Sequence, residues 1–113
     1  MKNVARNYVV VLVTCSSRRE ALKIARSVVE RRLAACVNML DAPVRSIYRW
    51  KGKIEEGREI LLLMKSSCAR LAALQAEVER LHRYEVPEFI ALPVVAGSEK
   101  YLAWINHCMR GKS

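Results

Sequence analysis

The feature that most constrains the fold is a run of β-branched residues followed directly by a helical pattern. Residues 8–15, YVVVLVTC, are almost continuously apolar, which is typical of a strand that is central in a sheet or covered on both faces. Residues 16–33 then place apolar side chains at helical spacing, and Ser17 forms a capping box with Glu20. The first two elements are therefore predicted to be a strand and a helix.

A long β-hairpin is predicted next. Two strand-like segments, residues 34–40 and 44–50, are separated by Pro43, which cannot donate a ladder N–H and indicates a bulge or an edge. A KGK turn follows, and residues 54–66 return as the partner strand. Gly57 within that strand is predicted to mark a second bulge.

The second half of the chain repeats the helix-then-strand order. Residues 67–82 are amphipathic and begin with Ser67 as the expected N-cap. Residues 88–95 form the last strand, in which Pro93 indicates an edge or a bulge. Residues 99–109 form a short final helix.

This order of elements predicts the fold class. A βαββαβ chain with right-handed crossovers gives a four-stranded antiparallel sheet with two helices on one face, the ferredoxin-like α+β arrangement. The long hairpin and the short C-terminal helix are additions to it. A chain of 113 residues fits a single domain, which we expect to span residues 1–113.

Composition excludes several classes of partner. The 52% hydrophobic content argues against disorder, and no apolar run approaches the roughly 18 residues that span a bilayer. The net charge of +9 is spread over solvated helix faces rather than gathered in a patch. An RNA-binding module of this fold needs aromatic rings on its central strands, where this chain has aliphatic residues. We therefore expect neither membrane nor nucleic-acid binding.

The four cysteines (Cys15, Cys36, Cys68, Cys108) are widely spaced and include no C-x-x-C pair. That spacing suits neither a zinc ribbon nor a redox motif, so reduced thiols and a cytoplasmic location are expected. No small-residue cleavage site accompanies the apolar N-terminal stretch, so we expect no cleaved leader.

Catalysis is not expected. An acylphosphatase-like enzyme needs a glycine-rich anion loop, and the segment TCSSRREA has no glycine. Cys15 lies near Arg18 and Arg19, but no base is placed beside it in the sequence.

The hairpin also predicts self-association. Arms of about a dozen residues span roughly 40 Å, more than one small domain needs. Tyr48 and Trp50 lie two apart on one face near its tip, and exposed paired aromatics usually mark an interface. We therefore expect a homo-oligomer in which each hairpin reaches a neighbour.

Several of these motifs resemble one family. The segments VRSIYRWKGKIEEGREILLLMKS, LHRYEVPEFIALPV and YLAWI are similar to the CutA family of divalent-cation tolerance proteins. The resemblance implies a ferredoxin-like subunit in a homotrimer, with a role in the response to metal ions and copper binding. It also implies an alternative function, because the CutA trimer is similar to the PII signalling proteins. That alternative is a sensor that binds a small, anionic ligand in the clefts between subunits, as the charge of +9 would favour.

The resemblance also implies a metal site. Copper ligands proposed in the family are a cysteine near the end of the first strand and a pair of histidines before the motif tyrosine. Here His82 falls on the motif, Leu81 precedes it, and Cys15 lies two residues beyond the family's cysteine position at Val13. With this reduced set we expect only weak binding of copper or another divalent metal at His82 and Cys15, and no obligatory cofactor.

The stretch LHRYEVPEFIALPV is interpreted as a helix-to-strand reversal that lines an intersubunit cleft. His82 is expected to cap the preceding helix, and Tyr84 needs a partner for its hydroxyl group. Glu85 and Glu88 are expected to pair with Lys65 or Arg49. The residues predicted at the cleft or interface are Tyr48, Trp50, Lys65, Tyr84, Glu85, Glu88 and Trp104.

Overall fold

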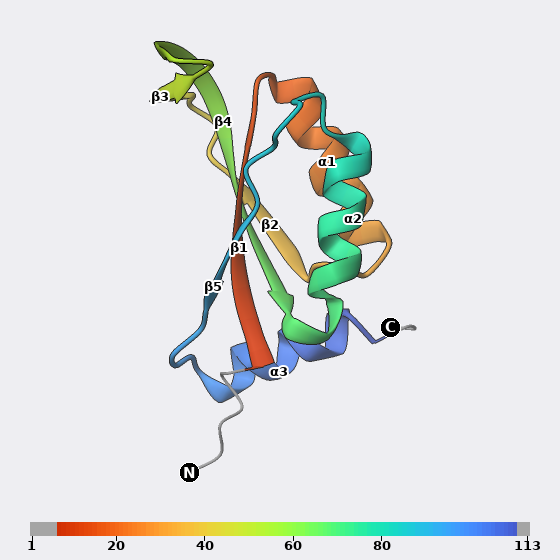
Figure 1. The fold of residues 1–113 in the computed structure, drawn as a ribbon. Coiled ribbons are helices and arrows are strands. Elements are labelled where there is room, and N and C mark those ends of the chain that lie inside the picture. Colours follow the sequence, from red (N-terminus) through yellow and green to blue (C-terminus); the bar gives the residue numbers. More distant parts are fainter. Residues whose placement is uncertain (1–6, 111–113) are drawn as a thin grey trace.

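The structure, a computed structural model, describes residues 7–110. Its elements in chain order are β1 (Tyr8–Cys15), α1 (Arg18–Glu30), β2 (Cys36–Met39), β3 (Val44–Trp50), β4 (Lys53–Ser67), a 3-10 turn (Cys68–Arg70), α2 (Leu71–Leu81), β5 (Ile90–Pro93) and α3 (Glu99–Cys108). Figure 1 shows α1 and α2 along one face of the sheet, with α3 across one end. The predicted ferredoxin-like α+β fold is confirmed.

The sheet follows the predicted connectivity. Its order is β2-β4-β1-β5, each pair is antiparallel, and β3 pairs with the outer part of β4. β2 and β3 therefore lie along the same side of β4 and together make the first arm of the long hairpin. β1 lies between β4 and β5, which explains why its sequence is almost continuously apolar.

The predicted irregularities have mixed outcomes. Met39 lies opposite Leu62 and Val44 opposite Glu59, so residues 40–43 face only two residues of β4. This is the bulge that Pro43 indicates. The second bulge, expected at Gly57, is wrong, because Gly57 pairs with Ser46 in an uninterrupted ladder.

The N-cap at Ser17 is confirmed for α1, but the returning bond of the capping box is not formed, because Glu20 Oε2 accepts from the Arg83 amide and Oε1 has no described partner. The N-cap expected for α2 is wrong. Ser17 Oγ accepts a 3.1 Å hydrogen bond from the Glu20 amide. Ser67 precedes a 3-10 turn instead, and its side chain makes no capping bond. Pro93 ends β5, which pairs only with β1 and is thus the expected edge strand.

The two faces of the sheet differ in their cover. Buried side chains of β1 and β4, among them Val11, Val13, Leu62 and Met64, form a core with α1 and α2. Residues paired across strands share a face, and much of the opposite face is apolar as well, although the hydrogen-bonded Lys65 and Asn38 lie on it toward β2. The opposite face carries Val10, Leu12, Leu61, Leu63, Ile90 and Leu92. No described helix lies along that face (Figure 1), and Ile90 and Leu92 are 48% and 46% exposed.

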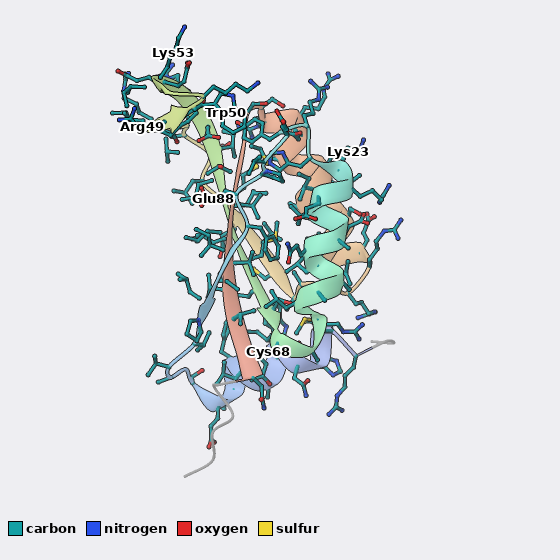
Figure 2. The ribbon with its side chains drawn as sticks, in the orientation of Figure 1. Lys23, Arg49, Trp50, Lys53, Cys68 and Glu88 are labelled. Carbon is teal, nitrogen blue, oxygen red and sulfur yellow. The ribbon has the colours of Figure 1, made fainter. Side chains whose placement is uncertain are left out.

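The outer half of the hairpin projects from the body of the molecule. Figure 2 shows Arg49, Trp50 and Lys53 at its tip, and the longest principal extent is 47 Å. The turn uses positive φ angles at Lys51 (51°) and Gly52 (82°). The side chains of Ile47 and Ile54 on this projection are more than half exposed. Within residues 7–110, no helix is long and apolar enough to cross a membrane.

Candidate functional site

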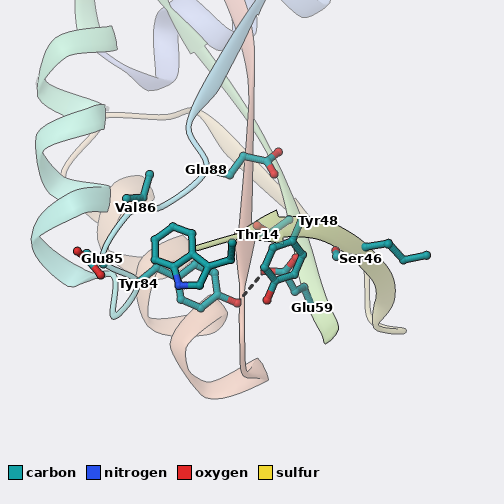
Figure 3. A pocket seen from close by; sticks show the side chains of 10 residues that line it. Thr14, Ser46, Tyr48, Glu59, Tyr84, Glu85, Val86 and Glu88 are labelled. Carbon is teal, nitrogen blue, oxygen red and sulfur yellow. Dashed lines mark hydrogen bonds between the residues drawn. The ribbon is translucent and has the colours of Figure 1, made fainter. Parts of the chain in front are cut away.

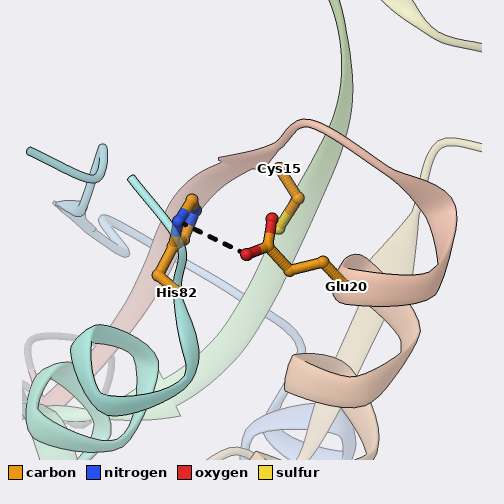
Figure 4. Close-up of side chains that lie close together, drawn as sticks. All are labelled: Cys15, Glu20 and His82. Atoms are coloured by element: carbon orange, nitrogen blue, oxygen red, sulfur yellow. Dashed lines mark ion pairs between the residues drawn. The ribbon is translucent and has the colours of Figure 1, made fainter. Parts of the chain in front are cut away.

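Three potential metal ligands meet where β1, α1 and α2 end or begin. Cys15 is the last residue of β1, Glu20 lies in the first turn of α1, and His82 follows α2. One ligand atom from each residue lies within 4.8 Å of the other two. Figure 4 shows the three side chains pointing toward one another. The structure thus brings the two predicted metal residues together and adds a carboxylate.

The hydrogen bonds of His82 fix its tautomer. The Thr14 carbonyl can only accept, so His82 Nε2 donates to it across 2.7 Å. The Tyr84 amide can only donate, so His82 Nδ1 accepts, at 3.1 Å. The ring is therefore neutral, and its contact with Glu20 Oε2 at 3.9 Å is not a full ion pair.

This arrangement corrects the expected capping role of His82. Its backbone N–H bonds to the Val78 carbonyl and ends α2, but its ring bonds to β1 and to the following turn instead of the helix carbonyls. The side chain thereby ties the end of α2 to β1. That position holds Nδ1 toward Glu20.

Glu20 has an incomplete set of hydrogen bonds. Its Oε2 accepts a 2.7 Å bond from the Arg83 amide. Its Oε1 is buried and has no partner among the described residues. A buried carboxylate oxygen without a donor is costly, and a cation would relieve that cost.

Cys15 is fully buried beside this carboxylate. Burial, and then the negative charges of Glu20 and Glu59, raise the pKa of the Cys15 thiol to about 12. The sulfur is therefore protonated near neutral pH. A metal ion bound here must displace that proton.

A pocket adjoins this group between the hairpin and the segment that follows α2. Its volume is about 560 Å³, and its lining residues are Thr14, Ser46, Ile47, Tyr48, Trp50, Glu59, Tyr84, Glu85, Val86 and Glu88. In Figure 3, Tyr84 and Glu59 face each other in the pocket, and Tyr84 Oη donates a 2.7 Å bond to Glu59. Burial and then this bond raise the pKa of Tyr84. Glu59 is thus the hydrogen-bond partner that the partly buried Tyr84 hydroxyl needs.

Five of the seven predicted cleft residues meet in this pocket: Tyr48, Trp50, Tyr84, Glu85 and Glu88. The other two lie elsewhere. Lys65 donates a hydrogen bond to Asn38 across the β2–β4 pair. Trp104 lies on α3 and stacks on Tyr101, with ring centroids 5.4 Å apart.

The ion pairs expected for Glu85 and Glu88 are not formed with Lys65, Arg49 or any other described residue. Instead, Glu88 lies in reach of a hydrogen bond with Thr14 and is repelled by Glu59. Burial and then that repulsion raise the pKa of Glu88.

Three residues of the ligand group and the pocket were not predicted from the sequence: Glu20, Glu59 and Thr14. Glu20 was interpreted only as the second half of a capping box, yet its side chain turns to a segment 63 positions away. Glu59 precedes the apolar run of β4, so its strand position could be predicted but its partner Tyr84 could not. Thr14 belongs to both features, since its carbonyl holds His82 and its side chain lines the pocket.

The fold and this buried group define a class: a small ferredoxin-like protein with a projecting hairpin and a Cys–Glu–His group at the end of its first strand. A family model described as the CutA1 divalent ion tolerance protein matches residues 9–108. The chain belongs to the CutA1 family, as the sequence motifs predicted.

Individual relatives agree with this assignment. The chain is 46% identical over 97 residues to the divalent-cation tolerance protein CutA of Thermus thermophilus, covering 86% of this chain and 93% of that protein. It is 50% identical over 94 residues to mouse Protein CutA, covering 83% of this chain. It spans about half (52%) of that mouse protein's length.

Solved structures show the same fold. The Thermus thermophilus Cut A1 structure superposes with a TM-score of 0.84 at 45% identity and covers 87% of this chain and 94% of that chain. CutA1 from Oryza sativa superposes with a TM-score of 0.89 at 37% identity and covers 96% and 99%.

Proposed function

We propose that this chain is a non-catalytic divalent-cation tolerance protein that binds copper or another divalent ion at Cys15, Glu20 and His82. The observation that carries the proposal is the convergence of three ligand atoms within 4.8 Å, one of them on a buried carboxylate whose Oε1 has no described partner. Thiolate, imidazole and carboxylate together suit copper and zinc better than magnesium or calcium.

The hydrogen bond that orients the His82 ring supports this choice. Histidines that ligate metals commonly donate their other ring N–H to a carbonyl or carboxylate, which fixes the tautomer. His82 donates in this way to the Thr14 carbonyl, and its Nδ1, which accepts the Tyr84 amide bond, lies 3.9 Å from Glu20 Oε2. All three ligand residues come from one chain.

The binding is proposed to be weak. The Cys15 thiol must lose a proton whose pKa is about 12, and His82 Nδ1 must give up its bond from the Tyr84 amide. Both costs reduce the net affinity. We expect a dissociation constant near micromolar, a standard free energy of about −8 kcal/mol.

The proposal includes a homotrimer in the cytoplasm. The uncovered apolar face of the sheet and the exposed residues of the hairpin support association of copies. The four cysteines are free thiols, which suits a reducing compartment. A relative from Arabidopsis thaliana is named as chloroplastic and one from Archaeoglobus fulgidus as periplasmic. Fractionation of cells expressing the chain is therefore the direct test of location.

Anaerobic calorimetric titration of metal-free protein with Cu²⁺ and Zn²⁺ tests the metal site. We expect one ion per chain, and at least a tenfold loss of affinity in Cys15→Ser and in Glu20→Gln. Cys68→Ser, at an exposed cysteine outside the site, is the matched control and should leave the titration unchanged. Equal binding by all three variants would place the metal elsewhere, and nanomolar wild-type binding would contradict the weak affinity.

A further inference from the structure

The pocket between the hairpin and the segment after α2 has the opposite charge to the rest of the chain. The chain carries a net charge of +9. The ten lining residues nevertheless include three carboxylates, Glu59, Glu85 and Glu88, and no lysine, arginine or histidine. An anionic ligand, which the overall charge would favour, would be repelled here. A cation would be attracted.

The carboxylates lack cationic partners. Glu59 accepts a hydrogen bond from Tyr84 and Glu88 interacts with Thr14, but no described basic group forms an ion pair with either. Glu59 and Glu88 repel each other. Burial and then this repulsion raise the pKa of Glu88. A bound cation would offset that repulsion.

Aromatic rings form much of the remaining wall. Tyr48, Trp50 and Tyr84 come from β3 and from the segment after α2, and Figure 3 shows Tyr48 and Tyr84 on either side of the Tyr84–Glu59 bond. Ring faces attract ammonium groups, tryptophan most strongly. The Trp50 ring already takes part in such a contact, because Lys51 Nζ lies 5.7 Å from its centroid.

The lining fits an organic cation better than a metal ion. Among the described residues, the only group of three or more metal-ligand side chains that converges is Cys15, Glu20 and His82, outside this pocket. Aromatic walls supply no ligand oxygens beyond the tyrosine hydroxyls, and a bare ion would leave most of the 560 Å³ unfilled. Volumes of this size are typical of sites for small organic molecules.

We propose that this pocket binds a small organic cation, an alkylammonium ion. Its ammonium group would lie near Glu59 and Glu88, against the rings of Tyr48, Trp50 and Tyr84. The proposal goes beyond metal binding, because the cation is held by charge and ring faces and not by coordination. It does not require the Cys15 group to bind metal.

Fluorescence of Trp50 provides the test. The chain has two tryptophans, so Trp104→Phe, on α3 and outside the pocket, leaves Trp50 as the only indole. Metal-free protein of this variant is titrated with choline, with the neutral analogue 3,3-dimethylbutan-1-ol and with sodium phosphate. We expect a saturable change with choline, about tenfold weaker binding of the neutral analogue, and no saturable change with phosphate.

Charge variants identify the groups responsible. Glu59→Gln and Glu88→Gln should each weaken choline binding by about tenfold, while Glu56→Gln, on the same hairpin and outside the pocket, should not change it. Glu88 lies on a segment outside the sheet, so its variant tests the proposal even if Glu59→Gln unfolds. Absence of saturable choline binding, equal affinity for the neutral analogue, tighter binding of phosphate, or insensitivity to Glu88→Gln would each overturn the proposal.

Discussion

Two buried carboxylates in this chain differ in how completely they are paired. Glu77 accepts bonds from Ser27 Oγ at 2.6 Å and from two Arg80 nitrogens at 2.9 and 2.7 Å, and Arg31 lies 3.4 Å away. Glu20, which is as deeply buried, leaves one oxygen without a described partner. A satisfied buried carboxylate stabilises the fold, whereas an unsatisfied one costs stability unless it binds something. Glu77 is therefore structural, and Glu20 is the functional candidate.

Replacing Glu77 should make the free energy of unfolding less sensitive to a fall in pH. Its bonds from Arg80 and then Ser27 lower the Glu77 pKa from the ordinary 4.5 to about 2. The ionised form is thus favoured in the folded state, so its contribution is present above about pH 4.5 and is lost as pH falls toward 2. Glu77→Gln should lose roughly 1–2 kcal/mol at pH 7 and little near pH 2, since the arginines that pair with it are more than half exposed.

Urea unfolding at fixed protein concentration, at pH 7 and pH 2, measures this difference. Glu30→Gln, an exposed carboxylate at the end of α1, is the control and should change stability little at either pH. An unchanged free energy of unfolding for Glu77→Gln at pH 7 would show that the network contributes nothing.

The Cys15 thiol should be the slowest of the chain's cysteines to react. It is fully buried, and its pKa of about 12 leaves almost no thiolate at pH 8. Cys68 is exposed and should react first. Timed iodoacetamide labelling with peptide mass spectrometry gives the order, and rapid stoichiometric labelling of Cys15 below neutral pH would contradict it.

At the scale of elements, the hairpin turn is where backbone conformation most restricts the sequence. Trp50 pairs with Lys53, and the two residues between them have φ angles of 51° and 82°. Positive φ at both central positions is the geometry of a type I′ turn. Gly52 meets no atom within 4 Å of an added Cβ, so only its backbone conformation requires glycine.

Alanine at the two hairpin glycines should therefore have different effects. Gly52→Ala forces a Cβ into positive φ and should destabilise the hairpin by about 1 kcal/mol. Gly57→Ala lies in a regular ladder, with only Tyr48 Oη at 4.0 Å from the new Cβ, and should be neutral or slightly stabilising. Amide hydrogen exchange along β3 and β4 measures both, and faster exchange in Gly57→Ala than in Gly52→Ala would refute this account.

Local patterns predicted the elements well, because strand and helix periodicity are written in adjacent residues. The bounds Tyr8–Cys15 and the start of α1 after Ser17 follow directly from them. The bulge predicted at Gly57 was wrong because a glycine in a strand indicates a bulge only on average. The hairpin ladder is interrupted instead on the opposite arm, at residues 40–43, which include Pro43. For the Cys15–Glu20–His82 group, the family motif marked only His82, and Cys15 was proposed although it lies two residues beyond the family's cysteine position at Val13. Glu20 carries no local signal of its distant contact.

At the scale of the whole molecule, one face of the sheet is not covered by α1 or α2. α1 and α2 bury one face of the sheet, and the other face exposes Leu92 and Ile90 beside half-buried Val10 and Leu12. An uncovered and largely apolar face of this kind is typical of an interface between subunits. The projecting hairpin adds further exposed apolar side chains at one end.

A charge placed on that face should dissociate the assembly. We expect the wild-type chain to have about three times the 12.9 kDa mass of one subunit by light scattering at micromolar concentration. Leu92→Glu should shift it to monomer, because burying an unpaired carboxylate in an apolar interface costs several kcal/mol. Leu22→Glu is the matched control, since Leu22 is similarly exposed but lies on α1, away from that face. A wild-type monomer, or a Leu92→Glu trimer as stable as the Leu22→Glu one, would show that the uncovered face is not the interface.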